Sequence, residues 1–351
     1  MLNLERLAWG ARRLATGRRP SIKEVASDSW EICPKEDANC PQAIFLEGAL
    51  DKITGYSPWT TEEDERRYIF GGQVTHAATR AYLLRNARVS GAWIYCGAYK
   101  AQHGYGPERV FRKQMSRFQR LGRAHLGSNF PGSNFFGHFL LDDFPLALIP
   151  DANSDLIVLE TNAYEHEAGY REILGLQRPP VVHHARVDEL IVYVDFAQNS
   201  LKAFRYNELR RRLRRSQGSA GSNGSKNVYL KRGATGEPRL VVNEEALEAH
   251  LAGLGFDIVE PAILNAQEIS RRVLDAQLVV SAEGSHLSHA IYSMAEEGAF
   301  LILQPPDRFA TTYKAFTDRM GMRFAFLIGD PADGGFSVDL DDLDRLLERL
   351  T

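Results

Sequence analysis

The chain has 351 residues, which is long for one domain and comfortable for two. Apolar residues make up 44% of the chain and charged residues 25%, proportions that are typical of a soluble globular protein with a sizeable core. The formal net charge of -3, together with the lack of interleaved aromatic and basic residues, argues against nucleic acid as a partner.

The first half of the chain contains strand and helix patterns of modest strength. Residues 1 to about 40 are polar and basic, are interrupted by Pro20, Pro34 and Pro41, and predict an irregular lead-in. Thr60 and the acidic residues that follow it predict either a capped helix start or a solvated loop. The other predicted elements are a strand or sheet edge at 43–50, strands at 92–96, 155–159 and 189–194, and a helix at 164–174. This alternation indicates an α/β domain.

Residues 131–146 combine a loop rich in Gly, Ser and Asn with a helix-like segment. On that helix His138 and Asp142 are four residues apart, so both lie on one face and an imidazole can meet a carboxylate. An imidazole beside a carboxylate is a proton acceptor near neutral pH, and an aspartate close to a sugar hydroxyl can act in the same way. The spacing equally fits an i,i+4 surface pair or a helix cap, since such pairs are common.

Residues 207–225 mark a change in composition. Five arginines within 210–215 are followed by the low-complexity segment 216–225, which is rich in Ser and Gly. We therefore place a domain boundary near residue 205. The arginine run fits either a surface that touches anionic lipid or an acidic acceptor or, with Leu209 and Leu213 as its only apolar anchors, a solvated helix face.

From Asn227 onward, short apolar strands alternate with helices. The predicted strands are 228–230, 256–259, 278–280, 299–303 and 324–328, and the helices are 243–251, 267–276, the segment after Gly284, and 313–320. This βαβαβαβαβ order predicts a parallel sheet that is covered on both faces and binds ligands at the C-terminal ends of its strands. An amphipathic helix at 340–350 is expected to pack on one domain or across both.

The turn Glu283-Gly284-Ser285 joins a buried strand to a helix at such a strand end. The N–H groups at a helix N-terminus are unpaired and the helix dipole is positive there, so this turn is a candidate anion site that suits a phosphate. The turn Lys231-Arg232-Gly233 also follows a strand. By itself the first turn equally fits a βα connection that binds nothing.

Several motifs are absent from the sequence. It has no G-x-x-x-x-G-K-[ST], no G-x-G-x-x-G after a strand, no G-x-S-x-G, and no D-x-D at a strand end of the kind that suggests a metal-held sugar nucleotide. Cys33, Cys40 and Cys96 lack zinc-site spacing and predict reduced thiols. No apolar run approaches the roughly 20 residues of a membrane span, and no secretory-type segment follows the N-terminal arginines, so we expect a cytoplasmic protein.

Three ordered segments between about residues 130 and 310 carry a family resemblance. Residues 137–145 read GHFLLDDFP, residues 229–233 read YLKRG and are followed by RLVVNE at 239–244, and residues 276–289 read AQLVVSAEGSHLSH. They resemble, in turn, the H-[WF]-L-L-D-x-x-P segment, the arginine-bearing strand with its N-E helix start, and the A-x-[VI]-[VI]-x-x-[HE]-G-[AS] turn of glycosyltransferase family 61. That family includes bacterial proteins of capsular polysaccharide biosynthesis. Its members often carry His where this chain has Glu283.

The resemblance implies a GT-B architecture, in which two Rossmann-like domains with parallel sheets face a cleft, and inverting, metal-independent transfer without a cofactor. We expect an acceptor-side domain at 1–205, a nucleotide-sugar domain at 206–335 and a C-terminal helix at 336–351. Asp142, or His138 paired with it, would accept the proton of the acceptor hydroxyl. The expected donor-binding residues are Arg232, Lys231, Glu283, Gly284, Ser285 and His286, with Asp143, Asn134 and His289 as further candidates.

Two other interpretations stay open. A non-catalytic nucleotide- or sugar-binding component of a polysaccharide assembly system would use His138 and Asp142 only structurally. A nucleotide-sugar epimerase on a similar fold would turn over without an acceptor. The expected partners are a nucleotide-sugar donor and a glycan acceptor, with no nucleic acid and no membrane span, and peripheral association with the inner face of the membrane stays open. Specificity lies in pocket contacts that no motif records.

Overall fold

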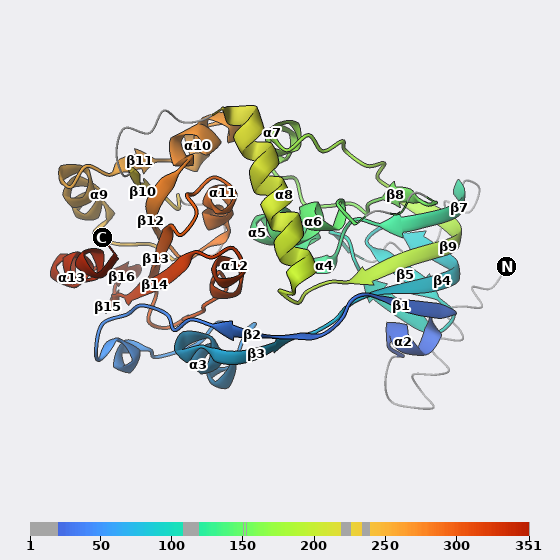
Figure 1. Cartoon of the computed structure of the whole chain (residues 1–351), viewed down its shortest axis with the longest axis horizontal. Helices are drawn as coiled ribbons and strands as arrows, with labels where there is room; N and C mark the ends of the chain where they lie inside the picture. The colour runs from blue at the N-terminus through green and yellow to red at the C-terminus, as the bar shows by residue number, and fades with distance from the viewer. Residues whose placement is uncertain are drawn as a thin grey trace. The chain divides into compact units, whose positions relative to one another are not determined.

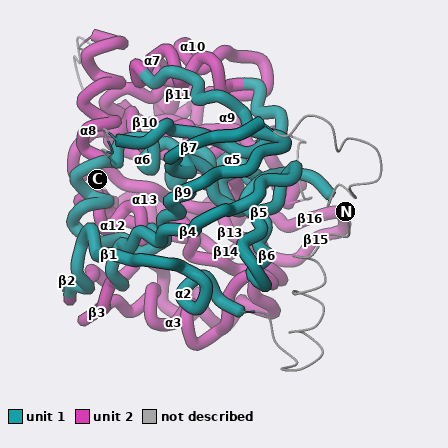
Figure 2. Tube along the Cα trace, turned by 90° about the vertical axis from the view of Figure 1, so that its right-hand side faces the viewer, with its two compact units in different colours: residues 1–36, 77–165, 176–205 teal, residues 37–76, 166–175, 206–351 magenta. Residues whose placement is uncertain are grey.

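The chain forms two compact units. A computed structural model describes residues 20–107, 119–149, 151, 153–218, 226–233 and 239–350. Unit 1 comprises residues 1–36, 77–165 and 176–205, and unit 2 comprises residues 37–76, 166–175 and 206–351 (Figure 2). The segments 37–76 and 166–175 thus belong to unit 2, although the expected N-terminal domain included them. Residues 1–19 of the lead-in and 219–225 of the low-complexity segment lie outside the described residues.

Unit 1 is built on a seven-stranded mixed sheet (Figure 1). Its strands are β1 (Asp28–Cys33), β4 (Thr79–Ser90), β5 (Trp93–Cys96), β6 (Tyr99–Gln102), β7 (Gln119–Leu126), β8 (Asp155–Ile157) and β9 (His184–Val194). The order is β6-β5-β4-β9-β7-β8, and β1 also pairs with β4. β7 runs parallel to β8 and β9, whereas β4 is antiparallel to β1, β5 and β9.

The expectation of a second parallel, Rossmann-like sheet in the N-terminal domain is wrong. Only Gly91 and Ala92 join β4 to β5, and a connection that short can only form an antiparallel hairpin. Gly91 has φ +56°, a conformation that glycine adopts without steric cost. β4 then pairs antiparallel with β9 along nearly its whole length. The broader expectation of a mixed α/β protein with parallel sheet segments is confirmed.

The expectation of an irregular lead-in is also wrong for its described part. That part contains α2 (Ile22–Val25), β1 and β2 (Glu36–Cys40). Polar and apolar residues alternate along β1, and the partly buried Trp30 and Ile32 pack on a cluster that includes Leu83 and Ile191. This alternation is the pattern of a strand with one buried face. β2 pairs with β3 (Gly72–His76) in a separate two-stranded sheet.

Unit 2 confirms the predicted alternation of strands and helices. Its parallel sheet has the order β11-β10-β12-β13-β14, with β10 (Lys226–Leu230), β11 (Asp257–Val259), β12 (Ala276–Ala282), β13 (Ala299–Gln304) and β14 (Arg323–Ile328). The connecting helices are α9 (Glu244–Gly253), η3 (Pro261–Ile263), α10 (Ala266–Val273), η4 (Ser285–Leu287), α11 (Ser288–Ile291) and α12 (Lys314–Arg319). In Figure 1, α9 and α13 (Leu340–Leu350) lie on one side of this sheet and α11 and α12 on the other. Leucines of α9 and α13 share a core with the strands.

Residues 37–76 complete unit 2 with a 3-10 turn, η1 (Ala49–Lys52), and α3 (Glu62–Phe70). Thr61 caps α3 by accepting a hydrogen bond from the Asp64 N–H at 3.2 Å, which confirms the capped helix start. The strand predicted at 43–50 is reduced to a single parallel bridge between Ile44 and Ala325.

Three further elements lie outside the two large sheets. They are α7 (Glu167–Ile173), the hairpin of β15 (Asp330–Ala332) and β16 (Gly335–Ser337), and α8 (Ser200–Gln217), which begins in unit 1 and ends in unit 2. None of the helices in the described ranges is both long enough and apolar enough to cross a membrane.

Candidate functional site

The segment that carries His138 is a succession of short helical turns in unit 1. It consists of α4 (Phe130–Asn134), α5 (Phe136–His138), η2 (Phe139–Asp143) and α6 (Phe144–Leu146). In η2 the chain forms a π-helical turn, because the Phe144 N–H donates to the carbonyl of Phe139, five residues back. Such turns are frequent at functional sites.

A tight loop fixes the start of this segment. The Asn129 side chain accepts a hydrogen bond from the Gly132 N–H at 2.9 Å, and the Asn129 N–H donates to Asp143 Oδ1 at 3.0 Å. A Cβ atom at position 132 would collide with the Asp143 carboxylate, so glycine permits this close packing. Asp143 therefore anchors the loop to the π-helical turn.

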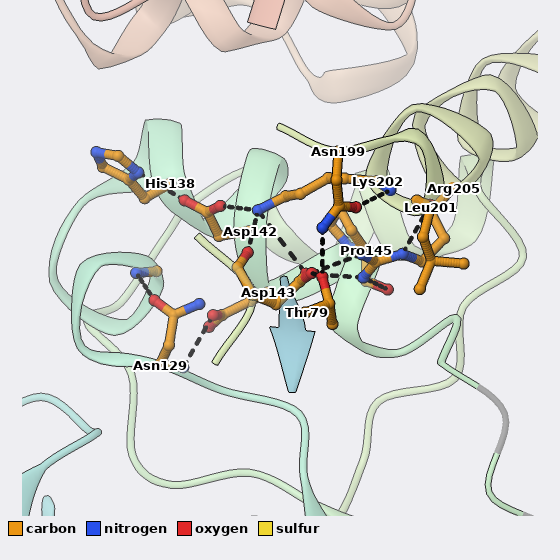
Figure 3. A network of polar contacts seen from close by, with 12 residues as sticks. Thr79, Asn129, His138, Asp142, Asp143, Pro145, Asn199, Leu201, Lys202 and Arg205 are labelled. Carbon is orange, nitrogen blue, oxygen red and sulfur yellow. Dashed lines mark hydrogen bonds and ion pairs between the residues drawn. The ribbon is translucent and has the colours of Figure 1, made fainter. Parts of the chain in front are cut away.

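His138 and Asp142 meet as their spacing predicts. His138 Nδ1 lies 2.7 Å from Asp142 Oδ2, and the His138 side chain is 35% exposed whereas that of Asp142 is 5% exposed. Figure 3 shows the imidazole at the edge of the polar network, with the carboxylate between it and the interior. An ionised carboxylate only accepts hydrogen bonds, so His138 Nδ1 is the donor of this bond, and Nε2 is the ring nitrogen left for a substrate.

Behind Asp142 lies a buried ion network that the sequence did not predict (Figure 3). The fully buried Lys202 ammonium donates to Asp142 Oδ1 and, at 2.7 Å, to the carbonyl of Asp195. Arg205 binds both carboxylate oxygens of Asp195 at 2.8 Å, and Thr79 Oγ1 donates to Asp195 Oδ1 at 2.7 Å. Two cations therefore face two carboxylates.

This network decides the charge of Asp142. Burial opposes ionisation, but the Lys202 charge and the hydrogen bond from His138 outweigh it and lower the Asp142 pKa to about 2. Asp142 is thus ionised at neutral pH, and a carboxylate with so low a pKa is a weak base. The arrangement fits an imidazole that exchanges protons and a carboxylate that orients it, as in other histidine-carboxylate pairs.

A second cluster lies in unit 2, where the strands β10, β12 and β13 end. The Arg232 guanidinium donates to the main-chain carbonyl of Glu283, and Arg239 donates to the Glu283 carboxylate. Arg308, in the loop after β13, has Nη1 3.8 Å from Glu283 Oε2. Three guanidinium groups and one carboxylate give the cluster a net charge of +2. Burial and then the neighbouring Arg239 lower the Arg232 pKa.

Gly284 permits the close approach of Arg232 in this cluster, since a Cβ atom there would collide with the guanidinium. The helix expected after Gly284 is short: η4 is one 3-10 turn and α11 is one α-helical turn. A helix dipole sums over aligned peptide units, so the arginines supply more positive charge here than the helix does.

His286 is neutral in this environment. It is buried, and burial together with the nearby arginines lowers its pKa to about 3. His286 Nε2 lies 2.6 Å from Ser281 Oγ, which itself donates to the Leu230 carbonyl at 2.6 Å. His286 thus ties the turn to β10. Ser285, the first residue of η4, directly follows Gly284.

The remaining candidates lie away from these contacts. Lys231 Nζ binds Glu248 Oε1 at 2.7 Å on α9 rather than Glu283. The Asn134 amide donates to the Phe130 carbonyl at 2.7 Å within its own loop. The buried His289 has Nδ1 2.7 Å from the Tyr170 hydroxyl.

The arginine run of α8 supports the interior of unit 2 more than a solvated face. Arg210 is buried and donates to the carbonyls of Ile291 and Met294 at 3.1 and 2.8 Å. Arg214 donates to the Met294 carbonyl and to Asp275. Arg211 and Arg215 are exposed.

Five charged residues of the two clusters were not among the site residues predicted from the sequence. They are Lys202, Asp195, Arg205, Arg239 and Arg308. Two of them had a signal in the sequence: Arg239 begins the segment 239–244 that carries the family resemblance, and Arg308 follows the strand predicted at 299–303. Among the described residues no group of three or more His, Cys, Asp or Glu side chains could hold a metal ion.

A family model described as Glycosyltransferase 61 matches residues 136–301. The matched stretch includes His138, Asp142, Arg232 and the turn at Gly284, so both clusters have members within it. No curated protein matches the chain.

Proposed function

Residues 136–301 belong to the glycosyltransferase 61 family and the chain is a glycosyltransferase enzyme; from this premise we propose that it transfers a sugar from a nucleotide-sugar donor to a glycan acceptor with inversion and without a metal ion. In the reaction an acceptor hydroxyl oxygen attacks the anomeric carbon from the side opposite the leaving group. The bond from that carbon to the diphosphate oxygen breaks, and the nucleoside diphosphate leaves with the electron pair.

His138 is the proposed base. Its Nε2 takes the hydroxyl proton as the new glycosidic bond forms, and Asp142 holds the ring and stabilises the imidazolium. The observation that supports this assignment most is the 2.7 Å contact between His138 Nδ1 and Asp142, with the carboxylate buried against Lys202 and the imidazole partly exposed. Asp142 itself is too acidic to be an efficient base.

The arginines of unit 2 are the proposed donor site. Arg232, Arg239 and Arg308 would neutralise the charge that develops on the leaving diphosphate, a task that preorganised cations perform well. Their net positive charge supports a doubly negative ligand and offers a substitute for a metal ion. Glu283 would hold Arg239 and Arg232 in place, which gives a reason for an acidic residue beside the turn glycine.

The wider setting belongs to the same proposal. The family resemblance implies a GT-B-type pairing of an acceptor domain with the nucleotide-sugar domain and a role in bacterial surface or capsular polysaccharide synthesis, and we propose a cytoplasmic location with them. The mixed sheet of unit 1 means that such a pairing would join one Rossmann-like domain to one of a different topology.

A transfer assay with a panel of nucleotide sugars and glycan acceptors tests the proposal. We expect product only when donor and acceptor are both present, an inverted anomeric configuration by NMR, and activity that persists in EDTA. Turnover without an acceptor would instead indicate an epimerase. Nucleotide-sugar binding without turnover across the panel would indicate a binding component.

A further inference from the structure

The loop that carries Arg308 is held in place by a segment from far upstream in the chain. Residues 54–57 run beside the loop after β13, and both segments belong to unit 2. Four backbone hydrogen bonds join them: Thr54 N–H and Gly55 N–H to the Pro306 carbonyl at 2.8 and 3.1 Å, Ser57 N–H to the Phe309 carbonyl at 3.0 Å, and Phe309 N–H to the Gly55 carbonyl at 2.9 Å. These bonds flank Arg308 on both sides and fix its backbone.

Gly55 makes this pairing possible. A Cβ atom at position 55 would collide with the main-chain carbonyl oxygen of Asp307, the residue before Arg308. A backbone atom cannot rotate away as the tip of a flexible side chain can. Any larger residue at position 55 must therefore push the Arg308 loop outward.

Glu65 in α3 fastens the far end of the same loop. Its buried carboxylate accepts hydrogen bonds from the Thr311 N–H at 2.6 Å and from the Thr311 hydroxyl at 2.5 Å. The rings of Tyr56 and Phe309 meet edge to face at a centroid distance of 6.3 Å. Residues 54–57 and Glu65 thus contact the loop both before and after Arg308.

We propose that residues 54–57 and Glu65 form a brace that holds Arg308 against the Arg232–Arg239–Glu283 cluster, so that Arg308 contributes to binding the diphosphate of the donor. Gly55 and Glu65 are then positioning residues. This inference rests on the proposed donor site. The brace, the loop and Arg308 all lie outside the matched residues 136–301, so they are additions that the family match does not cover.

Titration calorimetry with inorganic pyrophosphate on the full chain tests the brace. We expect Arg308→Gln to weaken pyrophosphate binding about 10- to 100-fold, as the loss of a charge-assisted contact does, and Arg308→Lys to weaken it less. Gly55→Ala should weaken it about 3- to 10-fold by displacing the loop. Gly253→Ala is the matched control, because a Cβ atom there meets nothing within 4 Å, and it should bind as the unaltered chain does.

Transfer kinetics and melting curves complete the test. Gly55→Ala and Glu65→Gln should raise KM for the donor more than they lower kcat. Both should melt below Gly253→Ala, because one displaces packed backbone and the other weakens buried hydrogen bonds, but both should stay folded at the assay temperature. If Arg232→Gln weakens pyrophosphate binding while Arg308→Gln and Gly55→Ala do not, the brace is refuted and the donor site stands. If the unaltered chain transfers sugar but does not bind pyrophosphate, the inference fails with the proposed anion site, and the transferase assignment is unaffected.

Discussion

The ion network around Asp142 and the arginine cluster around Glu283 both place charges out of water, but they differ in balance. In unit 1, Lys202 and Arg205 face Asp142 and Asp195. In unit 2, Arg239 and Arg308 face the carboxylate of Glu283, and Arg232 donates to the main-chain carbonyl of the same residue. Taking ions out of water costs several kcal/mol per ion unless partners compensate. A balanced network is thus suited to holding one reactive group still, and an unbalanced one to receiving an anion.

The largest expected effect is the loss of activity when His138, the proposed base beside the unit 1 network, is replaced. His138→Ala should lower kcat about 10²- to 10⁴-fold, because the acceptor hydroxyl would lose its proton acceptor. The melting temperature should change little, since the ring is partly exposed. His250→Ala is a matched control, because His250 also contacts an aspartate, Asp344, at 2.7 Å. Equal activity in both variants would remove His138 from the mechanism.

The balance of the unit 1 network is tested by Lys202→Met. Two buried carboxylates would lose a shared cation, and we expect the free energy of unfolding in urea to fall by about 3 to 5 kcal/mol. Lys52→Met removes a more exposed lysine that bridges Asp330 and Asp342, and should cost about 0 to 1 kcal/mol. If the free energy of unfolding falls equally in the two variants, the buried network stabilises the fold no more than a surface ion pair does.

The excess charge of the unit 2 cluster is tested by Arg232→Gln. We expect affinity for a nucleoside diphosphate to fall by about 1.5 to 3 kcal/mol, measured by calorimetry, and to become less dependent on salt. Arg120→Gln, at a side chain that is 80% exposed, should leave affinity unchanged. Unchanged binding in Arg232→Gln would contradict a donor site at Gly284.

The smallest expected effect is the loss of folding stability at low pH. The pKa of Asp142 is lowered to about 2 in the folded protein from an ordinary value of 3.8, so its contribution to stability is present above pH about 4 and is lost as the pH falls toward 2. The loss should be about 2 kcal/mol in urea unfolding. Asp142→Asn should lack this component, and an equal slope in both proteins would contradict the assignment.

Sequence patterns predicted unit 2 far better than unit 1. Each strand of the parallel sheet is a short apolar run between helices, so local periodicity marks it. β4 escaped prediction because polar residues such as Arg85, Asn86 and Arg88 break its alternation, and its partners β1 and β9 are remote in sequence.

The same contrast holds for the two clusters. His138 and Asp142 are four residues apart, so helical spacing alone brings them together. Lys202 lies 60 residues from Asp142 on an arginine-rich helix, where nothing in the sequence distinguishes it from a solvated lysine. Glu65 and Thr311 are 246 residues apart and can be paired only by the fold.

That last separation has a consequence for how the protein is made. At typical rates of about 5 to 20 residues per second, a ribosome needs roughly 10 to 50 s to proceed from Glu65 to Thr311. During that time α3 and the aromatic Phe45, which later stacks on Phe326 at 5.1 Å, have no sheet to cover. Residues 37–76 therefore leave the ribosome before the sheet on which they pack has been synthesised. A chaperone that covers them during synthesis should raise the yield of correctly folded molecules.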